Sequence, residues 1–140
     1  MKKLTIYTDG GARGNPGPAG IGAVIYDEKK NIVKEIAEYI GETTNNQAEY
    51  KACLRAMEEA KKISAQDEPV SDWELDFYLD SELVVKQLKR EYKVKNKDLA
   101  PLFMKIYNLS QQFEKVTFTH VKREFNKEAD ALVNKALDNR

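Results

Sequence analysis

Two aspartates stand at the ends of stretches that have the pattern of β-strands. Asp9 closes LTIYTD, which alternates and is rich in β-branched and aromatic residues, and Asp80 closes WELDFYLD, which also alternates. If these strands are parallel neighbours in an open α/β sheet, their carboxyl ends meet at one edge, where such sheets place their sites. Asp80 or Ser81 is locally just as well suited to cap the following helix. The pair therefore predicts a site on the condition that the two strands are parallel neighbours.

Two further acids interrupt the apolar stripes of predicted helices. Helical spacing aligns Glu49 with Cys53, and it aligns Asp130 with Val133. An unpaired charge in an apolar stripe is costly, and a single acid there usually marks a helix end or an ion pair. Two such acids, together with two more at strand ends, favour one shared site.

The chemistry of four gathered carboxylates points to hard cations. With one histidine in the chain and no cysteine near these acids, the ligand set suits Mg²⁺ or Mn²⁺ rather than zinc. Two such ions roughly 3.5–4 Å apart stabilise the attacking and leaving oxygens of an in-line phosphoryl displacement. The four acids therefore predict a phosphodiester substrate. Asp76 shares a side of its strand with Asp80, but it lies about 13 Å away along the strand and is predicted to be a surface acid.

The elements that must position these acids follow in the order βββαβααβα. Alternation predicts strands over residues 4–9, 20–27, 31–40, 73–80 and 115–124. Helical periodicity predicts helices over residues 43–63, 81–92, 97–113 and 126–139. Three hairpin strands followed by alternating helices and strands indicate an α/β fold with a five-stranded mixed sheet flanked by helices.

Composition places these elements in one domain over residues 1–140. The chain is 41% hydrophobic, and its 23 basic and 23 acidic residues leave no global basic field of the kind that marks many nucleic-acid binders. The charges are nevertheless segregated, with seven acids between Asp67 and Glu82 and a basic run from Lys86 to Lys97. Cys53 is the only cysteine and no apolar run is long enough to span a bilayer, so we expect a soluble cytoplasmic protein.

The stretch between the first two strands is unusually rich in glycine. Six glycines lie between positions 10 and 22, accompanied by Pro16 and Pro18, which is more than a tight turn requires. We expect Gly10 and Gly11 to keep side chains away, so that backbone amides can meet a sugar–phosphate backbone. Residues 14–20 are expected to shape a loop that presents Asn15.

Five segments, in this order, resemble the type 1 ribonuclease H family over nearly the whole chain: YTDGGARGNPGPAGIGAV, TTNNQAEYKA, LDSELVV, VKNKDLAPL and NKEADALVNKA. The ordered set is far more specific than any single motif. The resemblance implies a ribonuclease H-like fold and two divalent ions bound by Asp9, Glu49, Asp80 and Asp130. It implies hydrolysis of the RNA strand of an RNA–DNA hybrid, leaving 3′-hydroxyl and 5′-phosphate ends.

The resemblance also implies a role for each acid. Asp9 is expected to contribute to both metal sites, and Glu49 and Asp80 are expected to bind the ion nearer the leaving oxygen. Asp130 is expected to support the ion that holds the nucleophilic water. Arg123, in the short loop KREFN, is expected to contact the scissile phosphate or to help product leave. His120 falls inside the last predicted strand, so we assign it a structural role.

Substrate recognition is implied in the same way. Asn15, Asn45 and Asn46, with the backbone amides around Gly10 and Gly11, are expected to face RNA 2′-hydroxyls and the minor groove. A 2′-hydroxyl both donates and accepts hydrogen bonds, which suits amide side chains and separates RNA from DNA. The asparagines are also good helix N-caps.

Thr44 and Asn96 resemble the pair that binds a phosphate of the DNA strand, although Thr44 is equally a good N-cap and Asn96 a good turn residue. The chain departs from better-known members in two ways. A short lysine-bearing loop, residues 93–97, stands in place of a helical basic protrusion, which predicts weaker and more salt-sensitive binding. Glu82 stands where a neutral amide is common, so the substrate contact of that amide is not implied for this chain.

The leading hypothesis is a hybrid-specific endoribonuclease that is a monomer and has double-stranded RNA as a further candidate substrate. Two other functions compete with it. The first is a non-catalytic module that binds RNA–DNA hybrids with the same fold, and intact acids at all four motif positions argue against it. The second is a nucleotide-binding protein that uses the glycines for phosphates. The chain lacks both G-x-x-x-x-G-K-[ST] and a G-x-G-x-x-G placed before a helix, which argues against this second alternative.

Overall fold

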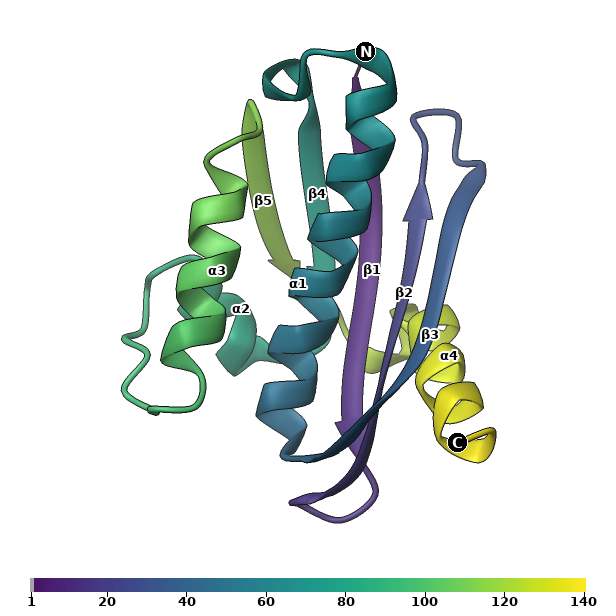
Figure 1. Cartoon of the computed structure of the whole chain (residues 1–140), viewed down its shortest axis with the longest axis vertical. Helices are drawn as coiled ribbons and strands as arrows, with labels where there is room; N and C mark the ends of the chain where they lie inside the picture. Colours follow the sequence, from purple (N-terminus) through teal and green to yellow (C-terminus); the bar gives the residue numbers. More distant parts are fainter. Residues whose placement is uncertain (1) are drawn as a thin grey trace.

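The computed structural model describes residues 2–140 as one mixed sheet with helices on both faces (Figure 1). The strands are β1 (Lys3–Ala12), β2 (Gly17–Tyr26), β3 (Ile32–Thr43), β4 (Glu74–Leu79) and β5 (Lys115–His120). The helices are α1 (Asn45–Ser64), α2 (Glu82–Leu88), α3 (Ala100–Ser110) and α4 (Lys127–Asp138). Short 3₁₀ turns span Ala65–Asp67, Val70–Asp72 and Arg123–Phe125. None of the helices in this described part of the chain has the length and apolarity needed to cross a membrane.

The sheet has the order β3-β2-β1-β4-β5. β1 pairs antiparallel with β2, and β2 pairs antiparallel with β3, as expected for three hairpin strands. β1 pairs in parallel with β4, with Ile6 opposite Phe77, and β4 pairs in parallel with β5. The predicted mixed sheet is therefore confirmed, and so is the condition that the strands carrying Asp9 and Asp80 are parallel neighbours.

The glycine-rich stretch is mostly sheet rather than loop, so the expected loop over residues 14–20 is correct for residues 14–16 and wrong for residues 17–20. β1 continues to Ala12 and β2 begins at Gly17, which leaves only residues 13–16 to connect them. Gly10 is paired with Ile21 in the antiparallel ladder. Glycine is a loop signal in sequence, but Gly10, Gly20 and Gly22 lie in strands at points where backbone of α1 or α4 covers the sheet.

Several other predicted boundaries differ from the structure by a few residues, and two of them have a visible cause. The last strand ends at His120 rather than at residue 124, because β4 itself ends at Leu79 and its carbonyl accepts the amide of Val121 as the final bond. The third helix begins at Ala100 rather than at residue 97. Asn96 Oδ1 accepts the amide of Asp98 at 2.7 Å, and this local turn delays the helix.

The main core lies between the sheet and the layer of α1 and α3, while α4 covers part of the opposite face (Figure 1). The apolar side of the central strands is fully buried there, as the alternation predicted. The largest buried side chains of this core are Leu4, Ile6, Ile25, Tyr50, Met57, Leu75, Phe77, Leu79 and Ile106. α4 packs mainly against β2 and β3, so the same face remains open over the other end of β1 and β4.

Gly10 allows α1 to lie directly on β1. A Cβ atom at this position would stand 2.3 Å from the carbonyl carbon and oxygen of Ala48. Real Cβ atoms do not approach backbone so closely, so any side chain at Gly10 would displace the helix. Ala48 directly precedes Glu49. The contact at Gly10 therefore sets how close the backbone of α1 at Glu49 lies to the sheet, and with it the position of the Glu49 carboxylate.

Gly22 has the same function on the opposite face. It is the antiparallel partner of Asp9, and a Cβ atom there would stand 2.3 Å from the carbonyl oxygen of Ala129 in α4. Ala129 precedes Asp130. Both helices that carry a predicted catalytic acid thus touch the sheet through backbone at a glycine next to, or opposite, Asp9.

Substituting Gly10 or Gly22 by alanine is expected to lower the free energy of unfolding by about 1–3 kcal/mol, because the added methyl group overpacks a backbone contact. Gly11→Ala is the matched control, since its Cβ would meet only a Val133 methyl group at 3.9 Å. We expect that control to stay within about 0.5 kcal/mol of the parent. Urea denaturation measures all three variants, and equal stabilities would contradict the close-contact argument.

Candidate active site

Three of the predicted acids converge at the carboxyl edge of β1 and β4. Asp9 lies in β1, Asp80 directly follows β4, and Glu49 reaches the same point from α1; one carboxylate oxygen of each lies within 4.8 Å of the others. Asp9 and Glu49 are only 7% and 6% exposed. Asp130, from the first turn of α4, adjoins Asp9 but is not a member of this close group. The convergence predicted from the strand ends is therefore observed.

The carboxylates stand in a cleft of about 510 Å³. Most of the residues singled out in the sequence line this cleft: Asp9, Gly10, Gly11, Asn45, Asn46, Glu49, Asp80, Arg123 and Asp130. Asn15, Thr44 and Asn96 are not among the lining residues. The structure thus gathers the acids, two asparagines and Arg123, while their roles in catalysis and binding remain predictions.

α1 is fixed against the free edge of β1 by its own side chains. The ladder between β1 and β4 ends at Tyr7 and Tyr78. Beyond it, Gly10 N donates to Glu49 Oε1 at 2.9 Å and Ala12 N donates to Asn45 Oδ1 at 2.8 Å. Four residues along a helix rise about 6 Å and two residues along a strand about 6.6 Å, so the two bonds match in spacing. Beyond the end of the ladder between β1 and β4, side-chain oxygens of α1 accept the hydrogen bonds of the β1 amides.

In this structure the amide of Gly10 donates to the protein itself, and its expected contact with a substrate remains a prediction. Its hydrogen bond to Glu49 occupies the donor. Asn15 and Asn45 are also linked, because Asn15 Oδ1 accepts the backbone amide of Asn45 at 2.9 Å. Both asparagines therefore use their side-chain oxygen within the protein, and their side-chain NH₂ groups are not part of these bonds. Gly11 remains a wall of the cleft.

Thr44 and Asn96 have the local structural roles that the sequence left open. Thr44 Oγ1 accepts the amide of Gln47 at 3.2 Å and caps α1. Asn96 holds the turn before α3. Their contact with a DNA-strand phosphate remains a prediction. The segment between Leu88 and Ala100 contains no helix, which agrees with the expected lack of a helical basic protrusion.

Burial and mutual repulsion raise the pKa values of the acids. The pKa of Asp9 is raised to about 7: burial is the largest cause, a hydrogen bond with Glu49 opposes the rise, and the charges of Asp80 and Asp130 add to it. Burial, with the charge of Asp9, raises the pKa of Glu49 well above its usual range. Glu49 Oε2 is buried and has no hydrogen-bond partner within residues 2–140. The close group of Asp9, Glu49 and Asp80 has no ion pair in the described part of the chain, and together with the orphaned oxygen of Glu49 this fits divalent cations.

Arg123 and His120 differ in their relation to the cleft. Arg123 Nη2 stands 3.7 Å from Asp130 Oδ1, and its side chain is 82% exposed, so the guanidinium lies at the rim beside an acid. An ion pair this exposed contributes little to stability. His120 ends β5 opposite Leu79, is exposed, and does not line the cleft. Its exposure gives no support to the structural role that we assigned to it.

Asn126 is the site residue that sequence reasoning missed. Its side chain is fully buried at the start of α4, yet it makes no capping bond. Instead, Nδ2 donates to the carbonyl of Thr8 at 2.9 Å and to Asp80 Oδ2 at 3.2 Å. Asn126 therefore ties α4, β1 and the carboxylate that follows β4 together. The sequence showed only an asparagine before a helix, which reads as an N-cap.

The fold and the cluster together define the class: an α/β protein whose carboxylates gather at the carboxyl edge of a mixed sheet. A family model described as reverse transcriptase-like matches residues 7–136. Bifunctional protein Rv2228c of Mycobacterium tuberculosis is 39% identical over 137 residues; the match covers 97% of this chain but only 36% of that protein. Ribonuclease H of Chlorobium phaeobacteroides is 32% identical over 155 residues, which cover 99% of this chain and 98% of the relative.

Solved structures agree with these relatives. LC11-RNase H1, isolated from compost, superposes with a TM-score of 0.90 at 49% identity, covering 99% of this chain and 98% of that one. LC11-RNase H1 in complex with an RNA/DNA hybrid superposes with a TM-score of 0.89 at 48% identity, covering 97% of each chain. The chain belongs to the ribonuclease H family.

Without divalent ions, the free energy of unfolding is expected to fall as pH rises from about 4 to about 7. A folded-state pKa raised above the unfolded value means that the folded protein binds more protons across this range, so stability is lost as Asp9 ionises. The effect of Asp9 on the free energy of unfolding is on the order of 3–4 kcal/mol, because its pKa is raised from 3.8 to about 7. Urea denaturation in chelator measures it, and Mg²⁺ should reverse it. Asp9→Asn should weaken the dependence; an unchanged slope in that variant would contradict the assignment.

Asn126→Ala is expected to cost about 1–3 kcal/mol of stability and to weaken Mg²⁺ binding, because it leaves the Thr8 carbonyl and an Asp80 oxygen without their donor. Asn139→Ala is the matched control, since Asn139 Nδ2 bonds Lys135 O in the exposed last turn of α4. Denaturation and calorimetric Mg²⁺ titration test both variants. If Asn126→Ala matched Asn139→Ala in both measurements, Asn126 would have no part in holding Asp80.

Proposed function

We propose that the protein is an endoribonuclease that hydrolyses the RNA strand of RNA–DNA hybrids. The observation that carries this proposal is the carboxylate cluster of Asp9, Glu49 and Asp80 in a cleft of a ribonuclease H family fold. The hybrid-bound relative supports the choice of substrate, because it superposes over almost the whole chain.

The proposed cofactor is a pair of Mg²⁺ ions, with Mn²⁺ as a substitute, held by Asp9, Glu49, Asp80 and Asp130. When bound, divalent ions activate water and stabilise the charge on the leaving oxygen, which gives 3′-hydroxyl and 5′-phosphate ends. The protein's own contribution is to hold the carboxylates ready. Gly10 N fixes one oxygen of Glu49 and leaves the other without a partner, while Asn126 orients Asp80.

Selection of the RNA strand is proposed to come from the asparagines beside the acids. Asn45 and Asn46 line the cleft, and Asn15 is bonded to the backbone of Asn45. Asn15 and Asn45 use their oxygens within the protein, so we propose that their NH₂ groups donate to RNA 2′-hydroxyls. A DNA strand lacks that acceptor, and cleavage is therefore confined to RNA.

The test is cleavage of a duplex in which either the RNA or the DNA strand carries a label, with Mg²⁺ and separately with Mn²⁺. We expect cuts in RNA only, with 3′-hydroxyl ends. Asp80→Asn should retain hybrid binding and lose at least about 100-fold in rate, because it removes a charged ligand of the cluster. Asp76→Asn is the matched control: it is the other aspartate on that side of β4 and pairs with Lys3 at 2.8 Å.

Three outcomes separate the alternatives. Binding without turnover under both metals would favour a non-catalytic hybrid-binding module. Full activity of Asp80→Asn would remove that acid from the site. Equal cleavage of double-stranded RNA would show that the 2′-hydroxyls of a single strand are enough for recognition, as the proposal allows.

A further inference from the structure

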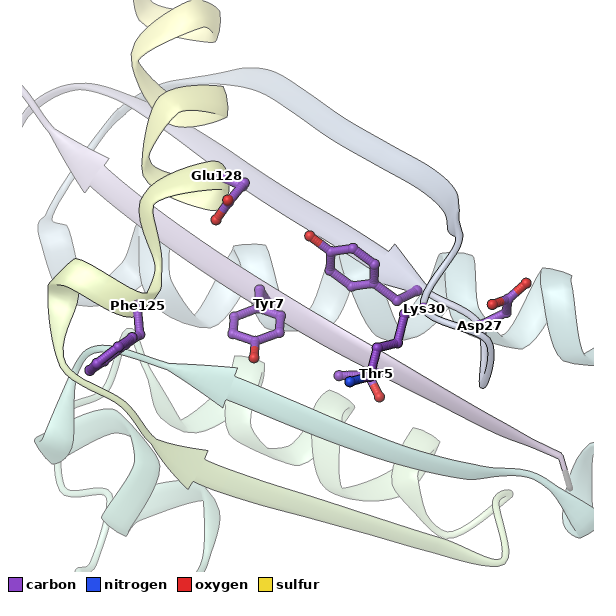
Figure 2. A pocket seen from close by; sticks show the side chains of 7 residues that line it. Thr5, Tyr7, Asp27, Lys30, Phe125 and Glu128 are labelled. Carbon is purple, nitrogen blue, oxygen red and sulfur yellow. The ribbon is translucent and has the colours of Figure 1, made fainter.

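A second cavity lies on the sheet face that α4 leaves open, beyond the start of that helix. It has a volume of about 350 Å³. Figure 2 shows Tyr7 in its middle, Phe125 and Glu128 at one end, and Lys30 with Asp27 at the other. None of the four predicted catalytic acids lines this cavity. Its chemistry therefore needs an explanation of its own.

Three tyrosines on neighbouring strands give the cavity an aromatic corner. Tyr7 stacks on Tyr78, with ring centroids 4.9 Å apart and planes 18° apart, so one face of the Tyr7 ring is covered. Tyr26 stands at 85° to Tyr7 with centroids 6.0 Å apart. Tyr26 lines the cavity and Tyr78 does not, so the cavity lies on the side of Tyr7 away from Tyr78. Phe125 extends the aromatic surface and is 64% exposed.

Glu128 supplies a negative charge at this corner. Within residues 2–140 it has no ion pair. Burial raises the pKa of both Tyr7 and Tyr26, and the nearby charge of Glu128 contributes to each shift. The other acid, Asp27, is committed to its own turn, because Oδ1 accepts the amides of Lys29 and Asn31 at 2.9 Å each. Of the two acids that line the cavity, Glu128 is therefore the one that we expect to bind a ligand.

We propose that this cavity binds an arginine side chain presented by a partner protein. Ring faces attract cations, and a guanidinium stacks on an aromatic ring while its fork bonds a carboxylate such as Glu128. The charge pattern also excludes other ligands. Glu128 and Asp27 repel the phosphates of a nucleic acid, and Lys30 at the far end opposes a second cation, as in a diamine.

The direct test is an NMR titration of the labelled protein with a capped Gly-Arg-Gly peptide. The matched ligand is the same peptide with citrulline, which keeps the shape of arginine and removes its charge. We expect saturable shifts of the Tyr7, Tyr26 and Phe125 signals with arginine, and at least about fivefold weaker binding with citrulline. A lysine peptide should bind between the two, because an ammonium group lacks the planar fork.

Variants locate the effect. Glu128→Gln should weaken binding of the arginine peptide about fivefold or more, and Phe125→Ala should weaken that binding about threefold. Glu124 is an exposed acid in the same 3₁₀ turn as Phe125, but it does not line the cavity. The control variant Glu124→Gln should therefore leave binding of the arginine peptide unchanged. All three positions are exposed, and the amide spectrum of each variant checks that the fold is retained.

Three results would overturn the proposal: no saturable shift at millimolar peptide, equal binding of the arginine and citrulline peptides, or equal weakening by Glu124→Gln and Glu128→Gln. A single-stranded oligonucleotide that shifts the same signals, and binds more tightly to Glu128→Gln, would also overturn it. That result would assign the corner to base stacking. Hybrid cleavage does not enter any of these measurements, so they stand apart from the proposed nuclease activity.

Discussion

The structure depends on two contacts in which helix backbone lies directly on strand backbone. At Gly10 and Gly22 a methyl group would stand 2.3 Å from the backbone of α1 or α4, so each helix lies this close to the sheet only because the strand residue is glycine. Each contact is made by the residue that directly precedes an acid. The position of the helix backbone against the sheet therefore also fixes the positions of Glu49 and Asp130. Metal and catalytic sites need groups held to about 0.5 Å, and a rigid backbone contact provides that precision better than side-chain packing.

This precision holds the carboxylates in an arrangement that they oppose. Asp9 and Glu49 are buried beside each other without a cation, and burial with like charges raises both pKa values. The protein tolerates the arrangement because fixed donors bind individual oxygens: Gly10 N for Glu49, and Asn126 Nδ2 for Asp80. A bound divalent cation would reduce this repulsion, so relief of the unfavourable arrangement would add to the affinity of the cluster for metal.

The sequence predicted the elements and the meeting of the acids, because both follow from local patterns. Alternation orients Asp80, and the order of strands makes it a parallel neighbour of Asp9. What the sequence could not show are contacts between distant segments. Residues 14–20 were expected to form a loop, whereas β2 already begins at Gly17. Asn126 was missed because its partner Thr8 is 118 positions away. The local role predicted for Thr44, an N-cap, is the one the structure shows.

The first turn of α4 separates the two surfaces that we describe. Asp130 points to the carboxylate cluster, Glu128 points to the tyrosine corner, and Ala129 between them rests on Gly22. Successive residues of a helix are about 100° apart, so two acids two positions apart face nearly opposite directions. A ligand couples two sites only through an element with two arrangements. The backbone contact between Ala129 and Gly22 is the point of this turn at which such a rearrangement would have to occur, because it joins the residue between the two acids to the sheet.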